Sequence, residues 1–414
     1  MRTLDEHLAA ILAVVRPLPP TRVPLEQALG LVAAGDAVSH VDLPGFDNSA
    51  MDGYAVRTAD VAEADPARSG SAVTLPVVLD IGAGDAVTER LRPGQAARIM
   101  TGAMLPDGAD TVVKVEDTDG GTVLVRIDRG AEPGTWIRRR GEDLARGRLV
   151  LTAGSVLTAR RIGLLAASGH RDVLVRPRPR VAVVSTGAEL VEPGLALAEG
   201  QLYDANSYLI AAAVTMAGGR PAYRGSVGDR PDEVLALLTR LAEEVDVIVT
   251  SGGVSMGAHD AVKQVLAPLG TVEFVQVAMQ PGRPQGFGVL GERQVPVFAL
   301  PGNPVSSYVS FEVFVRPALR AMLGLDPVVA TPVPGRLGAP LRSPDGRRQL
   351  ARARTQRTPD GWQVEPLAGQ GSHFVADLAE ADALVVVPES VTALDVGEQV
   401  EVLLLDGAGE RGAA

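Results

Sequence analysis

Residues 250–260 have the sequence TSGGVSMGAHD, and this segment decides the fold. It follows a short β-branched run at 245–249 that is typical of a buried strand. The next residues, 261–266, have apolar positions at helical spacing. A strand, a glycine-rich turn and a helix direct backbone N–H groups and the positive end of a helix dipole at an anion. The segment therefore favours a phosphate-binding loop in an α/β domain.

Asp260 ends this loop, and two interpretations of it remain open. A carboxylate beside a phosphate repels it unless a divalent cation lies between them, so the loop indicates a phosphate and Mg²⁺ together. Alternatively, Asp260 only caps the following helix, and Gly252 and Gly253 only form a turn.

Length and composition limit the classes of protein that this chain can be. Its 414 residues exceed one ordinary core, so we expect two to four domains. A net charge of −11 argues against a general nucleic-acid-binding protein, which would carry a basic face. The absence of cysteine excludes disulfides, thiolate metal sites and cysteine nucleophiles. Residues 1–15 do not resemble a signal peptide, and no apolar run approaches the roughly 18 residues of a membrane span, so we expect a cytoplasmic protein.

The fold class that the patterns predict is multidomain, α/β plus β. Strands and helices alternate from Val181 onward, which predicts a three-layer α/β domain with a parallel sheet. Short strands separated by glycines before residue 136 predict an inserted all-β module, and the last 80 or so residues predict a β barrel or small sheet. The expected limits are 1–46 with 142–177 for an amino-terminal linker domain, 47–141 for the inserted β-rich domain, 178–325 for the α/β domain, 326–405 for the C-terminal β barrel and 406–414 for a tail.

Polar side chains follow the carboxyl ends of the predicted parallel strands. They are Glu189, Asp229, Asp260 and Asn303. Open α/β sheets bind ligands at that edge. One acidic residue after a strand is most often a helix cap. Three of them beside two Gly/Ser loops indicate a magnesium–phosphate site.

Five motifs, in this order, resemble the MoeA family, the molybdopterin molybdenumtransferases of molybdenum-cofactor synthesis, related to the carboxy-terminal part of gephyrin. The motifs are FDNSAMDGYAV at 46–56, RIMTGA at 98–103, STGAEL at 185–190, SGGVS at 251–255 and PGNPVS at 301–306. One glycine loop would be a weak signal, whereas this ordered set is specific and spans nearly the whole chain.

The resemblance implies an enzyme that takes adenylyl-molybdopterin and molybdate. It would hydrolyse the adenylate with the help of Mg²⁺, insert the metal at the dithiolene and release AMP. The resemblance also implies an elongated homodimer, a MogA-like α/β domain, and an active site between that domain and other domains of the partner subunit. The upstream molybdopterin adenylyltransferase is a candidate partner, and neither nucleic acid nor a membrane is expected.

The residues of the site follow from the resemblance, motif by motif. Asp52 and Thr101 would come from one subunit, and the catalytic acids Glu189, Asp229 and Asp260, which are also the expected metal ligands, from the other. The expected substrate-binding residues are Ser251, Gly252, Gly253, Ser255, Arg283, Pro301, Asn303, Ser306, Arg352 and Ser372. Backbone N–H groups at 251–255 would hold the pyrophosphate, and Arg283, Ser306 and Ser372 are the candidates for molybdate.

Two departures from the family pattern and two alternative functions remain. The family usually has Lys-Pro-Gly-Lys-Pro where residues 280–284 are QPGRP, and a guanidinium is not interchangeable with an ammonium. The family's Gly-Asp-Glu-Leu is GAEL at 187–190, which removes one carboxylate.

A gephyrin-like scaffold without catalysis would not require acids around a phosphate loop. A molybdopterin adenylyltransferase would need only the α/β domain.

Overall fold

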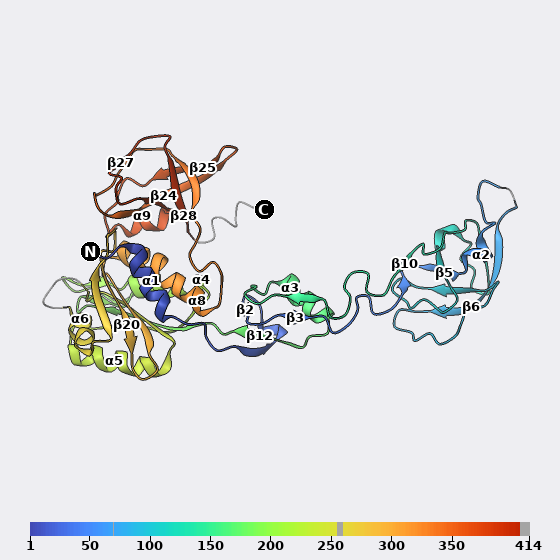
Figure 1. Cartoon of the computed structure of the whole chain (residues 1–414), viewed down its shortest axis with the longest axis horizontal. Helices are drawn as coiled ribbons and strands as arrows, with labels where there is room; N and C mark the ends of the chain where they lie inside the picture. The colour runs from blue at the N-terminus through green and yellow to red at the C-terminus, as the bar shows by residue number, and fades with distance from the viewer. Residues whose placement is uncertain (69, 255–259, 406–414) are drawn as a thin grey trace.

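The computed structural model describes residues 1–68, 70–254 and 260–405, and the chain is elongated (Figure 1). The α/β domain and the C-terminal barrel form a large end, a narrow arm follows, and a β module lies at the far end. Ser255 and the expected tail at 406–414 lie outside the described residues. Over the described ranges, every helix is too short or too polar to cross a membrane.

The α/β domain is a six-stranded sheet with helices on both faces. Its strands, in spatial order, are β16 (Arg220–Val227), β13 (Arg180–Thr186), β17 (Val247–Ser251), β21 (Val295–Leu300), β20 (Pro284–Leu290) and β18 (Val272–Gln276). Its helices are α4 (Asn206–Met216), α5 (Pro231–Glu244), α6 (Ala261–Leu266), α7 (Pro304–Ser310) and α8 (Arg316–Met322), the last two joined by a π-helical turn (Phe311–Val315). Val181 and Val183 belong to one buried cluster and Ala182 and Val184 to another, because successive side chains of a strand point to opposite faces.

The predicted parallel sheet is confirmed for its four-stranded core, and one of the six strands, β20, runs in the opposite direction. β16, β13, β17 and β21 are parallel, but β20 is antiparallel to both β18 and β21. The connections explain the difference. Only residues 291–294 separate β20 from β21, and a parallel crossover needs a dozen or more residues. The carboxyl ends of the four parallel strands nevertheless share one edge.

The C-terminal domain is a closed barrel, as the fold class predicts. Its strands are β22 (Val333–Leu337), β24 (Arg348–Thr358), β25 (Gly361–Pro366), β26 (Ala383–Val387) and β28 (Gln399–Leu404), and pairing of β24 with β26 completes the circle. The short strand β19 (Met279–Gln280) of the α/β domain pairs with β24, so a shared sheet edge joins the two domains. The helix α9 (Val375–Glu380) lies between them, in contact with both α7 and β24.

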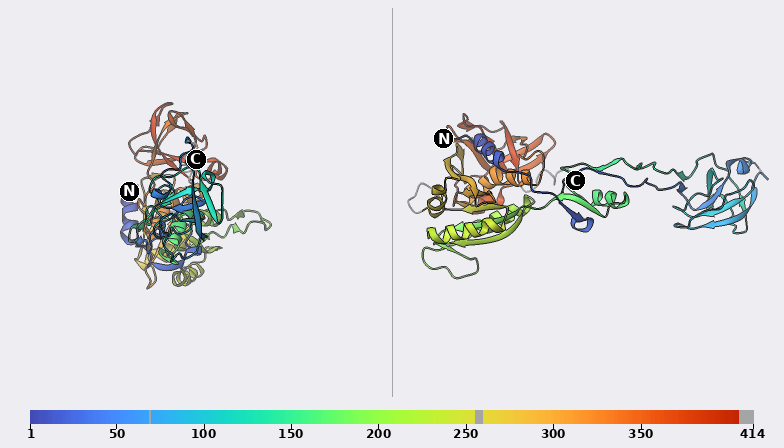
Figure 2. Two further views of the ribbon diagram at one scale, coloured as in Figure 1. Left: turned by 90° about the vertical axis from the view of Figure 1, so that its right-hand side faces the viewer. Right: turned by 60° about the horizontal axis from the view of Figure 1, so that its bottom comes forward.

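The chain runs out along the arm and returns, which makes the distal module an insertion (Figures 1 and 2). The arm contains β1 (Thr21–Pro24), β2 (Val32–Ala33), β3 (Ala37–Val38), β11 (Leu149–Leu151), β12 (Asp172–Arg176) and α3 (Ala159–Ala167). The distal sheet contains, in order, β8 (Thr111–Lys114), β5 (Gly53–Val56), β7 (Ala96–Ile99), β6 (Val73–Ile81) and β9 (Leu124–Ile127). We propose that the four units keep the limits expected from the sequence.

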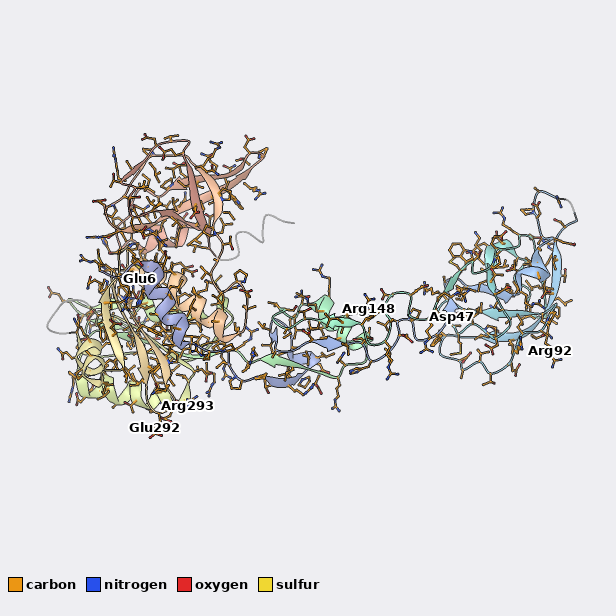
Figure 3. All side chains as sticks on the ribbon, in the orientation of Figure 1. Glu6, Asp47, Arg92, Arg148, Glu292 and Arg293 are labelled. Carbon is orange, nitrogen blue, oxygen red and sulfur yellow. The ribbon has the colours of Figure 1, made fainter. Side chains whose placement is uncertain are left out.

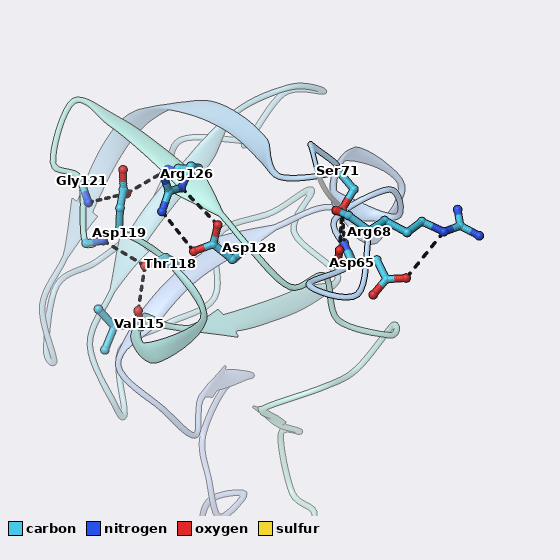
Figure 4. A network of polar contacts seen from close by, with 10 residues as sticks. Asp65, Arg68, Ser71, Val115, Thr118, Asp119, Gly121, Arg126 and Asp128 are labelled. Carbon is cyan, nitrogen blue, oxygen red and sulfur yellow. Dashed lines mark hydrogen bonds and ion pairs between the residues drawn. The ribbon is translucent and has the colours of Figure 1, made fainter.

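Polar contacts stabilise the junction between the arm and the distal module, and also the turns of that module. Arg139 pairs with Asp47 at 2.6 Å, and Arg140 pairs with Asp42 at 2.6 Å. These ion pairs join the outgoing and returning segments of the chain where the arm meets the distal module, near Asp47 in Figure 3. The charges of both arginines are therefore paired with carboxylates. In the module, Asp119 Oδ1 accepts the N–H groups of Gly121 and Arg126, as Figure 4 shows.

The helix α1 (Leu4–Val14) attaches the amino terminus to the large end. Thr3 and Glu6 form a capping box at its start, and Asp5 accepts two hydrogen bonds from Arg348 of the barrel, at 2.7 and 2.9 Å. His7 is 2 % exposed, its ring meets Phe314 edge-on, and its Nδ1 has no partner among the described residues. Burial, aided by the Arg2 charge and opposed by Glu273, lowers the pKa of His7 from 6.5 to about 4.

We expect His7 to make the free energy of unfolding depend on pH in the acidic range. Because the folded-state pKa lies below the unfolded value, the unfolded chain binds the extra proton between pH 6.5 and about 4. The contribution of neutral His7 to the free energy of unfolding should therefore be fully present above pH 6.5. The free energy of unfolding should then fall by about 3 kcal/mol as the pH falls through that window. Urea unfolding at each pH, on the parent and on His7→Leu, measures it. The variant should lose this part of the slope, and an identical slope in both proteins would contradict the assignment.

Candidate active site

A cleft of about 840 Å³ lies at the carboxyl edge of the parallel strands. Its lining includes the loops after β13, β16, β17 and β21, and residues of the barrel also reach it. Nine of the expected site residues line it. They are Glu189, Asp229, Ser251, Gly252, Gly253, Asp260, Pro301, Asn303 and Ser306. The residues reach one cleft because parallel strands end at the same edge.

The glycine loop follows β17 and is tightly packed. Gly252 has φ +98°, and a Cβ there would lie 2.6 Å from the carbonyl oxygen of Thr186. Its N–H donates to the Leu300 carbonyl at 3.1 Å, so this amide of the 251–255 segment is already used within the sheet edge. Within the described part of the loop, the amides of Gly253 and Val254 have no acceptor. These two are the donors that an oxyanion could use.

Gly252→Ala is expected to weaken binding of inorganic pyrophosphate at least about tenfold, because the methyl group collides with a backbone oxygen and moves the loop. Gly270 is the matched control. It has φ +71° in the same domain, with open space where a Cβ would stand, so Gly270→Ala should cost only about 1 kcal/mol of stability and leave binding intact. Calorimetric titration of both variants tests this, and equal affinities would contradict the packing argument.

Asp260 occupies the N-cap position of α6 but does not cap it. Among the described residues, its side chain makes no capping hydrogen bond, and its Oδ2 is buried without a partner. A helix cap would use the side-chain oxygen on the first-turn amides. The geometry therefore favours the ligand-binding interpretation of Asp260 over the capping one. The short length of α6, Ala261–Leu266, leaves little helix dipole to assist it.

Glu189 and Asp229 lie on the same cleft but are not assembled into a cage with Asp260. The described residues contain no group of three His, Cys, Asp or Glu side chains placed to hold a metal ion. Asp229 accepts the Ala188 N–H at 3.1 Å, and the Glu189 carboxylate folds back over Gly187. Glu189, Asp229 and Asp260 therefore line one cleft without forming a preassembled three-carboxylate cage, and their role as metal ligands stays a prediction. Mg²⁺ typically takes one or two carboxylates and completes its shell with phosphate oxygens and water, so the oxygen donors present still fit that ion.

The loop at 369–374 brings the barrel to the cleft. Ser372 Oγ accepts from Asn303 Nδ2 at 2.9 Å, its carbonyl accepts the Val305 N–H, and His373 lines the cleft. Asn303, like Asp260, makes no capping bond at the start of its helix among the described residues. Ser372 is therefore not part of the cleft lining but contacts Asn303, which is.

Arg352 supports this loop and does not line the cleft. It is 1 % exposed, and its guanidinium donates to the carbonyls of Gly369, Gly371 and Phe374. Its expected role in binding substrate directly is not what the structure shows. Arg283 is also outside the cleft lining, with an exposed side chain, although its neighbour Pro284 lines the cleft.

Asp204 and Asn206 also line the cleft, although neither is among the site residues expected from the sequence. Asp204 Oδ1 accepts from Ser185 Oγ at 2.7 Å and from the Ser207 N–H at 3.0 Å, so a cap does exist. Asn206 Nδ2 donates to Ser251 Oγ and to the Gly302 carbonyl. The sequence does hold one signal for them. Asp204 and Asn206 both lie just ahead of Ser207 at the start of a helix, and a single helix cap needs only one such side chain.

Asp52 and Thr101 lie in the distal module, at the other end of the chain from the cleft (Figure 1). The N–H and hydroxyl of Thr101 donate to Asp52 Oδ1 at 2.6 and 2.7 Å, and these two bonds lower the pKa of Asp52. The pair is preorganised as an ionised carboxylate. The long arm keeps it away from the Asp260 cleft of its own chain.

Three family models match consecutive parts of the chain. They are the MoeA N-terminal region (domain I and II) at 2–169, a probable molybdopterin binding domain at 182–321 and the MoeA C-terminal region (domain IV) at 334–405. The chain is 45% identical to molybdopterin molybdenumtransferase 2 of Mycobacterium tuberculosis, over 97% of this chain and 99% of that protein. It is 33% identical to molybdopterin molybdenumtransferase of Bacillus subtilis, over 92% and 89%. A crystal structure of a molybdopterin biosynthesis MoeA protein from Pyrococcus horikosii matches with a TM-score of 0.83 and 36% identity, over 98% of this chain and 99% of that one.

Proposed function

The chain belongs to the MoeA family, and on that premise we propose that it is a molybdopterin molybdenumtransferase of molybdenum-cofactor synthesis. Its substrates would be adenylyl-molybdopterin and molybdate, and AMP would be released in the cytoplasm. The observation that carries the proposal is the cleft itself, which is lined at the edge of a parallel sheet by Gly253 and Val254, whose amides have no acceptor among the described residues, and by Asp260, whose carboxylate does not cap its helix. That combination suits a pyrophosphate with a divalent cation.

The roles of the residues follow from their positions. The amides of Gly253 and Val254 would bind pyrophosphate oxygens, and Ser251 would keep the loop in place through its bonds with Asn206 and Ser307. Asp260, whose Oδ2 is open, and Asp229 would hold Mg²⁺, which when bound neutralises charge on the phosphate oxygens. Arg352 would act indirectly, by fixing the loop that carries Ser372.

Molybdate is an oxyanion substrate and needs hydroxyl or cationic partners. Ser306 lines the cleft and Ser372 lies beside it, so we propose these two ahead of Arg283. At the altered motif, Arg347 of the barrel donates to Gln280 at 3.3 Å. A cation therefore remains at this position although the family's first lysine is replaced.

A second copy of the chain would complete the site. The Asp52–Thr101 pair is built like a functional carboxylate, yet the arm keeps it away from its own cleft. We propose that the protein is a homodimer in which the distal module of one subunit faces the cleft of the other.

The test is an assay of the purified chain with adenylyl-molybdopterin, molybdate and Mg²⁺. We expect AMP to form in proportion to the substrate and molybdenum to become bound to the pterin product. Absence of AMP would overturn the proposal. Formation of adenylyl-molybdopterin from molybdopterin and ATP, without the later step, would instead favour the adenylyltransferase alternative.

A further inference from the structure

Three oxygen atoms at the floor of the cleft are buried and have no hydrogen-bond partner within the described chain. They are Asp204 Oδ2, Asn206 Oδ1 and Thr186 Oγ1. Asp204 is 1 % exposed and Thr186 is 7 % exposed. A buried unpaired polar atom costs about 1–3 kcal/mol, and more when it is charged. Such a group in a native structure therefore indicates a ligand or a water molecule.

The free oxygens are fixed by the bonds that their own side chains make. Asp204 Oδ1 is held by the Ser185 hydroxyl and the Ser207 N–H, which leaves only Oδ2 open. Asn206 Nδ2 is held by Ser251 Oγ at 2.8 Å and the Gly302 carbonyl at 2.7 Å, which leaves only its Oδ1 open.

Asp204 and Asn206 are bonded to neighbouring strands on the same face of the sheet. Ser185 and Ser251, to which Asp204 and Asn206 are bonded, are direct partners across β13 and β17. Thr186 follows Ser185, and its Oγ1 lies 2.8 Å from the place where a Cβ on Gly252 would stand. The recess is thus next to the loop that would hold the phosphates.

The hydrogen-bonding character of the recess selects its occupant. A carboxylate oxygen and an amide oxygen only accept, whereas the threonine hydroxyl can donate. One water molecule fits the two acceptors, because its two hydrogens can go to Asp204 and Asn206 while its lone pairs stay free. A phosphate oxygen would be repelled by the two acceptors.

We propose that Asp204, with Asn206, binds the water molecule that attacks the phosphoanhydride of the adenylylated substrate. This inference rests on the proposed function. A lone pair of the water faces the substrate beside the glycine loop, so Asp204 is a catalytic residue that contacts the attacking water. Phosphoryl transfer depends mainly on such positioning.

The step balances as a hydrolysis. The water oxygen forms a bond to one phosphorus, and the bond from that phosphorus to the bridging oxygen breaks. The electron pair stays on the bridging oxygen, which leaves with the other phosphate. The proton that the water directs at Asp204 passes to this carboxylate and then to solvent. The two products are AMP and molybdopterin with its own phosphate.

Asp204→Asn is the sharpest variant, because it keeps the cap and changes only the open atom. Its Oδ1 can still accept from Ser185 and Ser207, while an NH₂ donor replaces Oδ2. We expect single-turnover AMP release to fall about 100-fold or more, with the dissociation constant of adenylyl-molybdopterin changed less than about threefold. Rates are divided by the concentration of sites that bind substrate, so that partial unfolding cannot imitate a lost catalytic group.

Ser207→Ala is the matched control. It keeps the Ser207 N–H that caps onto Asp204 and removes only the hydroxyl, which accepts from Arg224 at 3.1 Å, so its AMP release should stay within about threefold of the parent rate. Asp204→Asn with a parental rate, or with weakened substrate binding and an unchanged rate, would overturn the inference. If the parent chain itself released no AMP, the proposed function would fail first, which is a separate outcome.

Discussion

Asp260→Asn is expected to release AMP about 100- to 1,000-fold more slowly than the parent chain. The carboxylate stands at the cleft with one buried oxygen that no described residue satisfies, and it is not used as a helix cap. Asparagine keeps the size of the side chain but removes the charge that would hold a divalent cation beside a phosphate. The effect should therefore fall on the reaction and on metal affinity, with little change in folding.

The matched control for Asp260 is Asp232→Asn, which makes the same change in charge on α5. Asp232 pairs with Arg230 at 3.0 Å on the exposed surface, so its replacement should leave AMP release unchanged. Binding of Mn²⁺, followed by electron paramagnetic resonance in the presence of AMP, provides a readout independent of turnover. If Asp260→Asn bound Mn²⁺ and released AMP like the parent, Asp260 would not belong to the metal site.

Asp52→Ala is expected to lower AMP release about 100-fold while the melting temperature stays within about 2 °C of the parent value. The side chain is exposed, so its loss should cost the fold little, and its two bonds from Thr101 keep it ionised and in one orientation. Asp80→Ala in the same sheet is the control, because Asp80 is exposed and pairs with Arg98 at 3.3 Å on the surface. Turnover and thermal unfolding of both variants measure the result, and a parental rate for Asp52→Ala would remove the distal module from the site.

Local patterns in the sequence were sufficient for the parallel core of the α/β domain and for most of the cleft. Strands followed by Gly/Ser loops place Asp260 and Glu189 at one edge, since parallel strands share their carboxyl ends. The reversal of β20 could not be predicted from apolar periodicity, which does not encode strand direction. It follows from the short connection at 291–294.

Side-chain roles that depend on distant contacts were not predictable. Arg352 alternates with alanines in β24 like any exposed strand arginine, and only the loop at 369–374 buries it. Asp204 has the sequence context of a simple cap, and its second, unpaired oxygen is visible only in three dimensions. Burial and pairing of this kind depend on the tertiary packing of segments far apart in the chain.

The central claim is that each cleft is completed by the distal module of a second subunit, and mixing two inactive variants tests it most directly. Asp52→Ala and Asp260→Ala subunits are unfolded together and refolded as a mixture, and AMP release is compared with each variant alone. In a mixed dimer, one site would combine an intact cleft with an intact Asp52, so random pairing should restore about a quarter of the parent activity. Activity no higher than that of the separate variants, with mixed dimers present, would contradict the account.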